Sequence, residues 1–239
     1  MNVWQALCHP PKVAYKHSGT YTMAKIDIAV VDYGMGNLRS VSKAVEHVAD
    51  GKSVVVTSDA TLIQQADRVI FPGQGAMPDC MRELDARGLR GAILHAAANK
   101  PFLGICIGMQ LLFDHSEEGD TAGLGLFRGD VKRFAAHQII DGEKLKIPHM
   151  GWNHVYQVKN AQNKAHDLWQ DIADATRFYH VHSYYAAPID ATLIAGETED
   201  PNRFCSVVAQ DNIFATQFHV EKSAQAGLQL LRNFVYWKP

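Results

Sequence analysis

The chain has 239 residues, of which 47% are hydrophobic and 20% are charged, and its formal net charge is -2. These values suit one α/β domain with a full core, and they exclude a strongly basic protein that binds nucleic acid or an anionic membrane. No apolar stretch approaches the roughly 20 residues that a membrane-spanning helix needs.

The spacing of cysteine, histidine and glycine gives no sign of a disulfide, a metal or a cofactor. The four cysteines form neither a CxxC pair nor a disulfide framework, so we expect a reducing, cytoplasmic compartment. No two histidines have H-x-x-x-H spacing with a third ligand, and we expect no metal. Gly34 and Gly36 lack the rest of the dinucleotide-binding pattern, and we expect no cofactor.

The first 22 residues differ from the rest of the chain. They have no sustained hydrophobic period, contain Pro10-Pro11, and lack the apolar run and cleavage site of a signal peptide. Met23 stands directly before the first strand-like run. We therefore expect residues 1–22 to be a poorly ordered N-terminal extension and residues 23–239 to form the domain.

The first half of the chain alternates strand-like and helix-like segments. Strands are predicted at 26–32, 53–57, 68–71 and in the first part of 100–110. Helices are predicted at 38–49, 79–87 and 89–99, with another after a cap at Ser58 or Asp59. This order favours a mainly parallel central sheet with helices on both faces, in which ligands bind beyond the carboxyl ends of the strands.

The second half contains more short strands separated by turn residues, which favours extra antiparallel strands. They are predicted at 131–134, 144–158, 177–184, 192–197, 204–209 and 213–218. An amphipathic helix at 223–234 closes the chain, and no linker interrupts it. The fold class is therefore α/β in a single domain.

The stretch Lys100–Gln110 contains the motif G-x-C-x-G around Cys106. It resembles a nucleophile elbow, in which a strand turns sharply into a helix and exposes one side chain. Glycines flank such a turn because a Cβ there would collide with neighbouring backbone. The unpaired N–H groups of the helix start can hold an oxyanion. On this motif alone, a buried cysteine in a glycine-rich turn is an equally good interpretation.

A nucleophilic cysteine needs a base, and the best candidate is His219, with Glu221 two residues later. In an extended segment, residues two apart point to the same side, so both side chains can face Cys106. His219 would take the thiol proton and Glu221 would fix its tautomer. The alternative is a core histidine followed by a helix-capping glutamate. A triad predicts acyl transfer without separating a peptidase from an amidase.

At this point the sequence resembles the class I (triad) glutamine amidotransferases. The motifs that carry the resemblance are G-I-C-I-G-M-Q at 104–110, P-G-Q-G at 72–75 and Q-F-H-V-E-K-S at 217–223. Three further motifs are similar to the glutaminase subunits of imidazole glycerol phosphate synthase. They are D-Y-G-M-G-N-L-R-S at 32–40, I-P-H-M-G-W-N at 147–153 and Y-H-V-H-S-Y at 179–184.

The resemblance implies the role of each site residue. Cys106 would attack the side-chain amide of glutamine, His219 would pass its proton to the departing ammonia, and Glu221 would orient His219. The implied oxyanion-hole residues are Ile107, Gly73 and Gln74. The implied glutamine-binding residues are Gly73, Gln110, Ser183 and Tyr184.

The resemblance also implies a partner, a (βα)8-barrel cyclase that forms a heterodimer with the glutaminase and receives its ammonia. The cyclase products are imidazole glycerol phosphate, for histidine biosynthesis, and an aminoimidazole carboxamide ribotide. The implied docking residues are Asn37, Pro148, Met150, Trp152 and Asn153. Trp152 would be an anchor, because aromatic side chains often dominate interfaces. The alternative for Trp152 is a core position.

One residue departs from the family pattern: Val220 stands where the family usually has proline between the histidine and the glutamate. Proline fixes φ, and valine restricts it less. We predict that the triad survives. The competing functions are another class I amidotransferase, a non-catalytic homologue and a related peptidase. The 147–153 motif argues against the first, the intact triad against the second, and Gln110 with Ser183-Tyr184 against the third.

Overall fold

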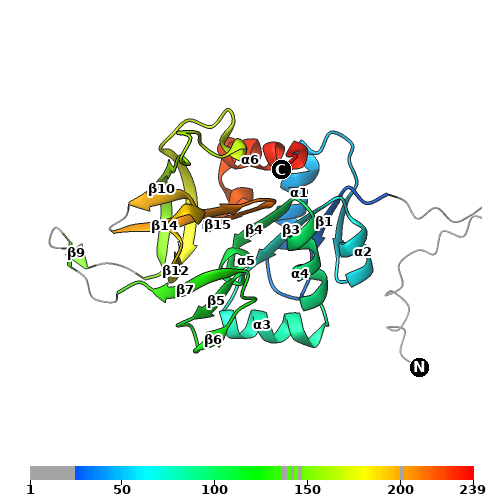
Figure 1. The fold of residues 1–239 in the computed structure, drawn as a ribbon, viewed down its shortest axis with the longest axis horizontal. Coiled ribbons are helices and arrows are strands. Elements are labelled where there is room, and N and C mark those ends of the chain that lie inside the picture. The colour runs from blue at the N-terminus through cyan, green and yellow to red at the C-terminus, as the bar shows by residue number, and fades with distance from the viewer. Residues whose placement is uncertain (1–24, 136–138, 141–142, 145–146, 200–201) are drawn as a thin grey trace, which may run out of the picture.

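The computed structural model of the protein describes residues 25–135, 139–140, 143–144, 147–199 and 202–239. The predicted N-terminal extension at 1–22 lies outside these residues. Within them, a 13-stranded mixed sheet forms the centre of the molecule (Figure 1). No helix in the described part of the chain is both long enough and apolar enough to cross a membrane.

One half of the sheet consists of parallel strands in the order β2-β1-β3-β4-β15. Their bounds are β1 Ile28–Val31, β2 Val54–Thr57, β3 Arg68–Gly73, β4 Phe102–Cys106 and β15 Ile213–Thr216. The predicted parallel sheet is therefore confirmed. Its last member, β15, comes from the end of the chain and lies beside β4.

Helices cover both faces of these parallel strands (Figure 1). On one face are α1 (Leu38–Val48) and α6 (Ala224–Tyr236). On the other are α2 (Ala60–Gln65), α3 (Met77–Ala86) and α4 (Arg90–Asn99). The carboxylate of Asp59 caps α2 by accepting from the N–H of Thr61 at 2.7 Å, as one of the two predicted caps.

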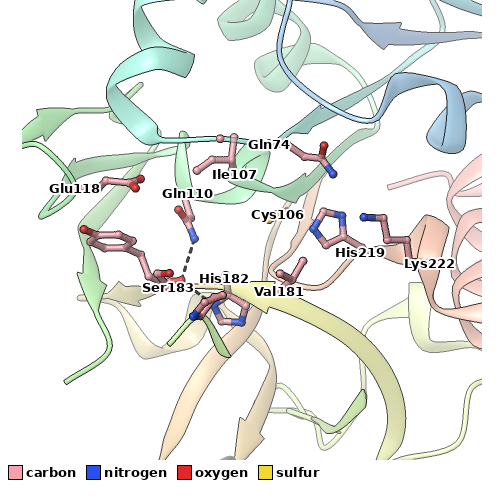
Figure 2. Close-up of a pocket in the computed structure, with 13 residues that line it drawn as sticks. Gln74, Cys106, Ile107, Gln110, Glu118, Val181, His182, Ser183, His219 and Lys222 are labelled. Atoms are coloured by element: carbon pink, nitrogen blue, oxygen red, sulfur yellow. Dashed lines mark hydrogen bonds between the residues drawn. The ribbon is translucent and has the colours of Figure 1, made fainter. Parts of the chain in front are cut away.

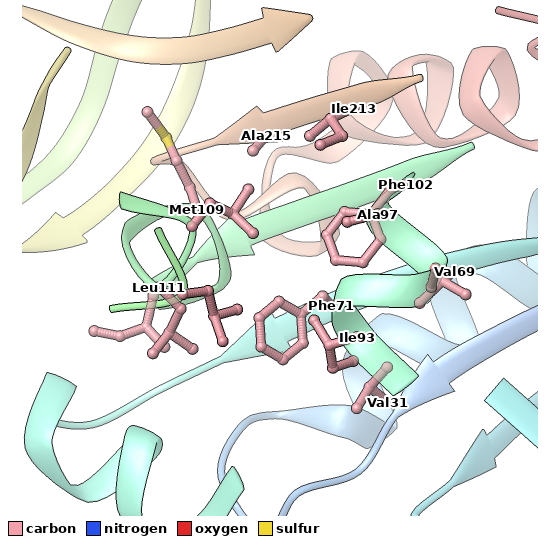
Figure 3. Close-up of a cluster of buried hydrophobic side chains, with 14 of the residues drawn as sticks. Val31, Val69, Phe71, Ile93, Ala97, Phe102, Met109, Leu111, Ile213 and Ala215 are labelled. Atoms are coloured by element: carbon pink, nitrogen blue, oxygen red, sulfur yellow. The ribbon is translucent and has the colours of Figure 1, made fainter. Parts of the chain in front are cut away.

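Strand alternation explains why two cores form. Ile28 and Val30 of β1 pack in the cluster that includes α1 and α6, whereas Ala29 and Val31 pack in the cluster on the opposite face. Figure 3 shows the second cluster, where Val31, Phe71 and Phe102 lie close to Ile93 of α4. Because both faces of the parallel sheet are buried, the sequences of its strands are continuous apolar runs.

The other half of the sheet is largely antiparallel and continues from β15 in the order β14-β12-β7-β5-β6. These strands are β14 Arg203–Gln210, β12 Tyr184–Pro188, β7 Phe127–Arg133, β5 Phe113–Ser116 and β6 Thr121–Ala122. Three further strands form a branch of this sheet. In it, β13 (Ile194–Glu199) pairs with β14, β10 (His149–Gln157) pairs with β13, and β11 (Thr176–His182) pairs with β10. The predicted extra antiparallel strands are confirmed, although β5, β6, β8 (Ile139–Ile140) and all but the first residue of β12 were not predicted.

The remaining elements are short. A two-stranded sheet pairs β8 (Ile139–Ile140) with β9 (Glu143–Lys144). Single-turn helices are α5 Ile107–Gln110 and the 3-10 helices η1 Asp167–Trp169, η2 Ala191–Leu193 and η3 Val220–Lys222.

Helix α6 packs closely on η3 because residue 227 is glycine. A Cβ added to Gly227 would lie 1.9 Å from the main-chain oxygen of Val220. Gly91, in α4, offers a matched helical position, because a Cβ added there meets nothing within 4 Å.

We predict that Gly227→Ala lowers the free energy of unfolding by at least about 2 kcal/mol, the range of a steric clash in a core. Gly91→Ala should leave it unchanged or raise it by up to about 1 kcal/mol, because alanine is the better helix former. Urea denaturation of both variants measures the difference. Equal effects of the two substitutions on the free energy of unfolding would show that the close approach of α6 to η3 does not require glycine at position 227.

Candidate active site

Cys106 ends β4 at the carboxyl edge of the sheet, between the ends of β3 and β15 (Figure 2). Gly73 of β3 is its partner in register. On the other side, Thr216 pairs with Ile105, so Gln217 follows at the level of Cys106. Cys106 has φ 57° and ψ -111°, a strained backbone for a residue with a Cβ. This geometry is that of a nucleophile elbow.

The flanking glycines make this turn possible. A Cβ on Gly108 would lie 1.8 Å from the main-chain oxygen of Phe71. A Cβ on Gly104 would lie 2.9 Å from Cβ of Ala215 and 3.0 Å from the oxygen of Gly108. The predicted need for glycine at both positions is confirmed. The helix that follows is only the single turn α5, shorter than the sequence suggested, because the chain enters the buried Leu111–Phe113 segment directly afterwards.

His219 and Glu221 face each other, with 2.9 Å between Nδ1 and Oε1. Their side chains are only 3% and 1% exposed, so water hardly screens this pair. The second carboxylate oxygen of Glu221 has no hydrogen-bond partner among the described residues. The pairing that the sequence predicted for these two side chains is therefore present.

The local backbone differs from the extended segment that we expected. Strand β15 ends at Thr216, and residues Val220–Lys222 form the 3-10 helix η3. The side chains of His219 and Glu221 meet across the start of that turn instead of along a strand. Two hydrogen bonds fix the residue: the N–H of His219 donates to the oxygen of Tyr179 at 2.9 Å, and the hydroxyl of Ser223 donates to the oxygen of His219 at 2.6 Å.

Val220 is buried and belongs to the core cluster beneath α6. Packing in this cluster therefore holds Val220 in place. The survival of the His219–Glu221 pair agrees with the sequence-based prediction.

The surroundings of His219 favour its charged form. Burial alone would lower its pKa, but interactions with the side chains of Cys106 and Glu221 outweigh burial and raise the pKa above its ordinary value. The site can therefore hold an imidazolium between a sulfur and a carboxylate.

A cavity of about 420 Å³ opens above Cys106 (Figure 2). The predicted site residues that line it are Cys106, Ile107, Gln74, Gln110, Ser183, Tyr184 and His219. Gly73 lies beside Cys106 in the sheet, and Glu221 lies behind His219. The structure thus gathers the predicted triad, oxyanion and glutamine-binding residues around one space.

Close packing also brings together the two main-chain segments predicted for the oxyanion hole. A Cβ on Gly73 would lie 2.1 Å from the hydroxyl of Tyr33 and 2.3 Å from Cγ2 of Ile107. Only glycine allows the end of β3 to approach the residue after Cys106 so closely.

Sequence reasoning missed four polar residues of the site, of which His182 and Lys222 line the cavity. Glu118 lines the cavity, and its Oε2 accepts from the N–H of Met77 at 2.8 Å. Gln217 donates from Nε2 to Sγ of Cys106 at 3.9 Å. The position of Gln217 directly after a strand neighbouring the elbow was a usable signal, whereas Glu118 stands in a polar loop without one.

The predicted docking residues lie around and beyond the mouth of the cavity. Met150 and Trp152 of β10 are 63% and 45% exposed, which excludes the core position considered for Trp152. Pro148 is exposed and lines the cavity. Asn153 is half-buried and hydrogen-bonds to His149, and Asn37 stands on the turn before α1.

No group of three or more His, Cys, Asp or Glu side chains in the described part of the chain could hold a metal ion. The polar groups around Cys106 are instead a base, a carboxylate and amides. Chemically, this arrangement suits attack of a thiolate on a carbonyl carbon.

Comparisons with known proteins agree with this geometry. Residues 29–237 match the model of the family "Glutamine amidotransferase class-I". The chain is 60% identical over 215 residues to the imidazole glycerol phosphate synthase subunit HisH of Aromatoleum aromaticum, covering 89% of this chain and 99% of that relative. The HisH of Dechloromonas aromatica is 60% identical over 220 residues, covering 91% and 100%. The chain therefore belongs to the class I glutamine amidotransferase family and, within it, to the group of imidazole glycerol phosphate synthase subunits.

Solved structures agree on the fold. PurLQS from Thermotoga maritima has a TM-score of 0.62 at 18% identity, covering 88% of this chain and 97% of that one. A crystal structure described as a glutamine amidotransferase has a TM-score of 0.61 at 14% identity, covering 87% and 96%. The family resemblance and the fold class predicted from the sequence are confirmed.

The raised pKa of His219 predicts a pH-dependent contribution to stability. The folded protein keeps a proton that the unfolded chain releases near pH 6.5, so the contribution is complete below that pH and is lost as pH rises through the raised folded pKa. The stability difference between the wild type and His219→Asn should therefore shrink by at least about 1 kcal/mol between pH 6 and pH 10.

Urea denaturation across this pH range measures that difference. His95→Asn, on the exposed surface of α4, is the control substitution. A stability difference for His219→Asn that is constant with pH would contradict the proposed charge state.

Proposed function

We propose that the chain is the glutaminase subunit of an imidazole glycerol phosphate synthase, and that it hydrolyses glutamine to glutamate and ammonia at Cys106. The observation that carries the proposal is the buried His219–Glu221 pair beside a cysteine on a strained turn, at the base of a cavity. The printed names of relatives that are 60% identical support the same assignment.

In this mechanism the imidazolium of His219 stabilises Cys106 as a thiolate, and Sγ attacks the side-chain amide carbon of glutamine. The N–H groups of Ile107 and of the Gly73–Gln74 segment stabilise the oxyanion. Losing one such donor typically costs about 10²–10³ in rate. His219 then protonates the departing ammonia, and water releases glutamate from the thioester. Glu221 keeps the imidazole oriented throughout.

The polar groups of the cavity suit glutamine as the substrate. Gln110, Ser183, Tyr184 and Gly73 bind it. The carboxylate of Glu118 adds a negative group on the cavity wall, which suits the α-ammonium of an amino acid. A peptide substrate would have no such charge at that position.

The partner is the cyclase subunit, a (βα)8 barrel, and the two subunits form a heterodimer. The surface that docks on it includes Asn37, Pro148, Met150, Trp152 and Asn153. Ammonia passes from the cavity to the cyclase, which makes imidazole glycerol phosphate and aminoimidazole carboxamide ribotide. Exposed apolar side chains next to the cavity mouth support this arrangement, because exposed apolar surface is typical of interaction sites.

The domain that carries the activity comprises residues 23–239, preceded by the extension 1–22. We place the enzyme in the cytoplasm, with glutamine as its substrate and with no nucleic acid or membrane as a partner. The free thiols of Cys80, Cys106 and Cys205 suit a reducing compartment.

Replacing the nucleophile tests the reaction. With the cyclase subunit present, Cys106→Ala should reduce glutamate release by at least about 10³, because covalent catalysis is lost. Cys205→Ala, at another buried free cysteine, is the matched control and should retain turnover. A coupled glutamate assay measures both, and full turnover by Cys106→Ala would exclude the mechanism.

Replacing Trp152 tests the docking surface. Trp152→Ala should weaken binding of the cyclase subunit at least about tenfold, as expected for loss of an aromatic anchor. Ile189→Ala removes another exposed apolar side chain, at 73% exposure, outside the docking residues and should bind normally. Isothermal titration calorimetry gives both dissociation constants. Equal affinity of Trp152→Ala and the wild type for the cyclase subunit would refute the proposed docking surface.

A further inference from the structure

A chain of hydrogen bonds runs from the cavity wall to the sulfur of Cys106. Nε2 of Gln110 donates to the main-chain oxygen of Tyr184 at 3.0 Å, drawn as a dashed line in Figure 2. It also donates to Oε1 of Gln217 at 2.9 Å. Nε2 of Gln217 in turn donates to Sγ of Cys106 at 3.9 Å.

One main-chain carbonyl fixes the direction of the whole chain of bonds. The oxygen of Tyr184 only accepts, so the side chain of Gln110 must present its NH2 group there. That NH2 group has two hydrogens, and the second must meet an acceptor, which is Oε1 of Gln217. Gln217 is then left with its own NH2 group toward Cys106.

Burial and backbone contacts make this orientation rigid. Gln217 is fully buried and Gln110 is 2% exposed, so water does not compete for these groups. The backbone N–H of Gln217 donates to the oxygen of Ser206 at 2.8 Å, which fixes the residue to the neighbouring strand β14. A buried amide whose position is fixed in this way is a preorganised donor.

We propose that Gln217 is a further catalytic residue: its amide N–H supports negative charge on Sγ of Cys106, and its carbonyl orients Gln110 toward the substrate. The first role acts when sulfur carries negative charge, before it attacks and when the thioester C–S bond breaks with its electron pair passing to sulfur. In the second role, the carbonyl of Gln217 occupies a hydrogen of the Gln110 amide. Oε1 of Gln110 is then free to accept a hydrogen bond from the substrate in the cavity. This inference rests on the proposed glutaminase function for its kinetic part only.

Two variants of Gln217 separate these roles from a structural one. Gln217→Met keeps the length of the side chain and removes both polar groups. Gln217→Glu keeps an acceptor for Gln110 and offers Sγ an O–H donor only while the carboxyl is protonated. Ionisation of that carboxyl as pH rises replaces the donor with a negative charge next to the sulfur.

The first readout is alkylation of Cys106 by iodoacetamide in the full-length chain, followed by peptide mass spectrometry. For Gln217→Met we expect a rate about tenfold below wild type at pH 6, because the lost hydrogen bond lowers the fraction of thiolate by the scale of a hydrogen bond to a charged group. For Gln217→Glu we expect a rate near wild type at pH 6 that falls to or below that of Gln217→Met by pH 9. No glutamine is needed, so this readout stands apart from the proposed reaction.

The second readout is glutamine turnover in the complex with the cyclase subunit. Gln217→Glu should lower kcat with rising pH and leave KM unchanged, because Gln110 keeps its partner. Gln217→Met should lower kcat and raise KM. Wild-type turnover in the same assay tests the proposed function itself.

Gln157 provides matched controls, because its Nε2 donates to the oxygen of Ile172 at 2.8 Å at a site that does not line the cavity. Gln157→Met and Gln157→Glu should alkylate and turn over as wild type does. Thermal unfolding of all four variants checks that each is folded at the assay temperature. Alkylation of Gln217→Met at the wild-type rate, or of Gln217→Glu without a pH trend, would overturn the inference.

Discussion

The close approach of the backbone at Gly108 to β3 is the constraint on which the site depends. A Cβ on Gly108 would lie 1.8 Å from the main-chain oxygen of Phe71, so any other residue there would force α5 away from the sheet. That contact bends the chain immediately after β4 and leaves Cys106 with a positive φ. Since β3 and β15 flank β4, the same bend sets the sulfur between Gly73 and Gln217. The packing of the parallel sheet therefore compensates for the backbone strain at Cys106.

Support for the His219–Glu221 pair comes from a different part of the molecule. His219 is held through its own N–H and oxygen by Tyr179 and Ser223, and Glu221 stands on a 3-10 turn that packs beneath α6. Gly227 allows this packing, and Val220 fills the core below it. A proline before Glu221 would restrict one dihedral, whereas here tertiary contacts fix the same position. The pairing of His219 with Glu221 thus depends on the C-terminal helix more than on the residue between them.

Much of this arrangement could be predicted from the sequence because it is carried by local pattern. Glycine spacing around Cys106 predicts the elbow, apolar runs predict the parallel strands, and motif order predicts the family. The short strands β5 and β6 could not be predicted, because β5 (FDHS) has one large apolar residue and β6 (TA) is only two residues long, so neither shows a period. The direction of the amides of Gln110 and Gln217 also escaped prediction, because it depends on the carbonyl of Tyr184, far away in sequence. Glu118 was missed for a similar reason: only the folded chain brings its loop to the cavity.

The proposed docking surface and the cavity share one pair of strands. Trp152 of β10 lies opposite Tyr179 of β11, and β11 continues into the cavity-lining segment from Val181 to Tyr184. Behind these strands, the rings of His149, His180 and His182 pack with centroids 5.2 to 5.6 Å apart. Burial lowers the pKa of His180 to about 3 and that of His182 well below its ordinary value, so these two rings pack as neutral groups. These two neutral rings pack against Phe204, so close packing holds the strand β11 that leads to the cavity-lining residues. The hydrogen bonds from Gln110 to the carbonyl of Tyr184, and from Gln110 through Gln217 to Cys106, therefore join the end of this pair of strands to the sulfur.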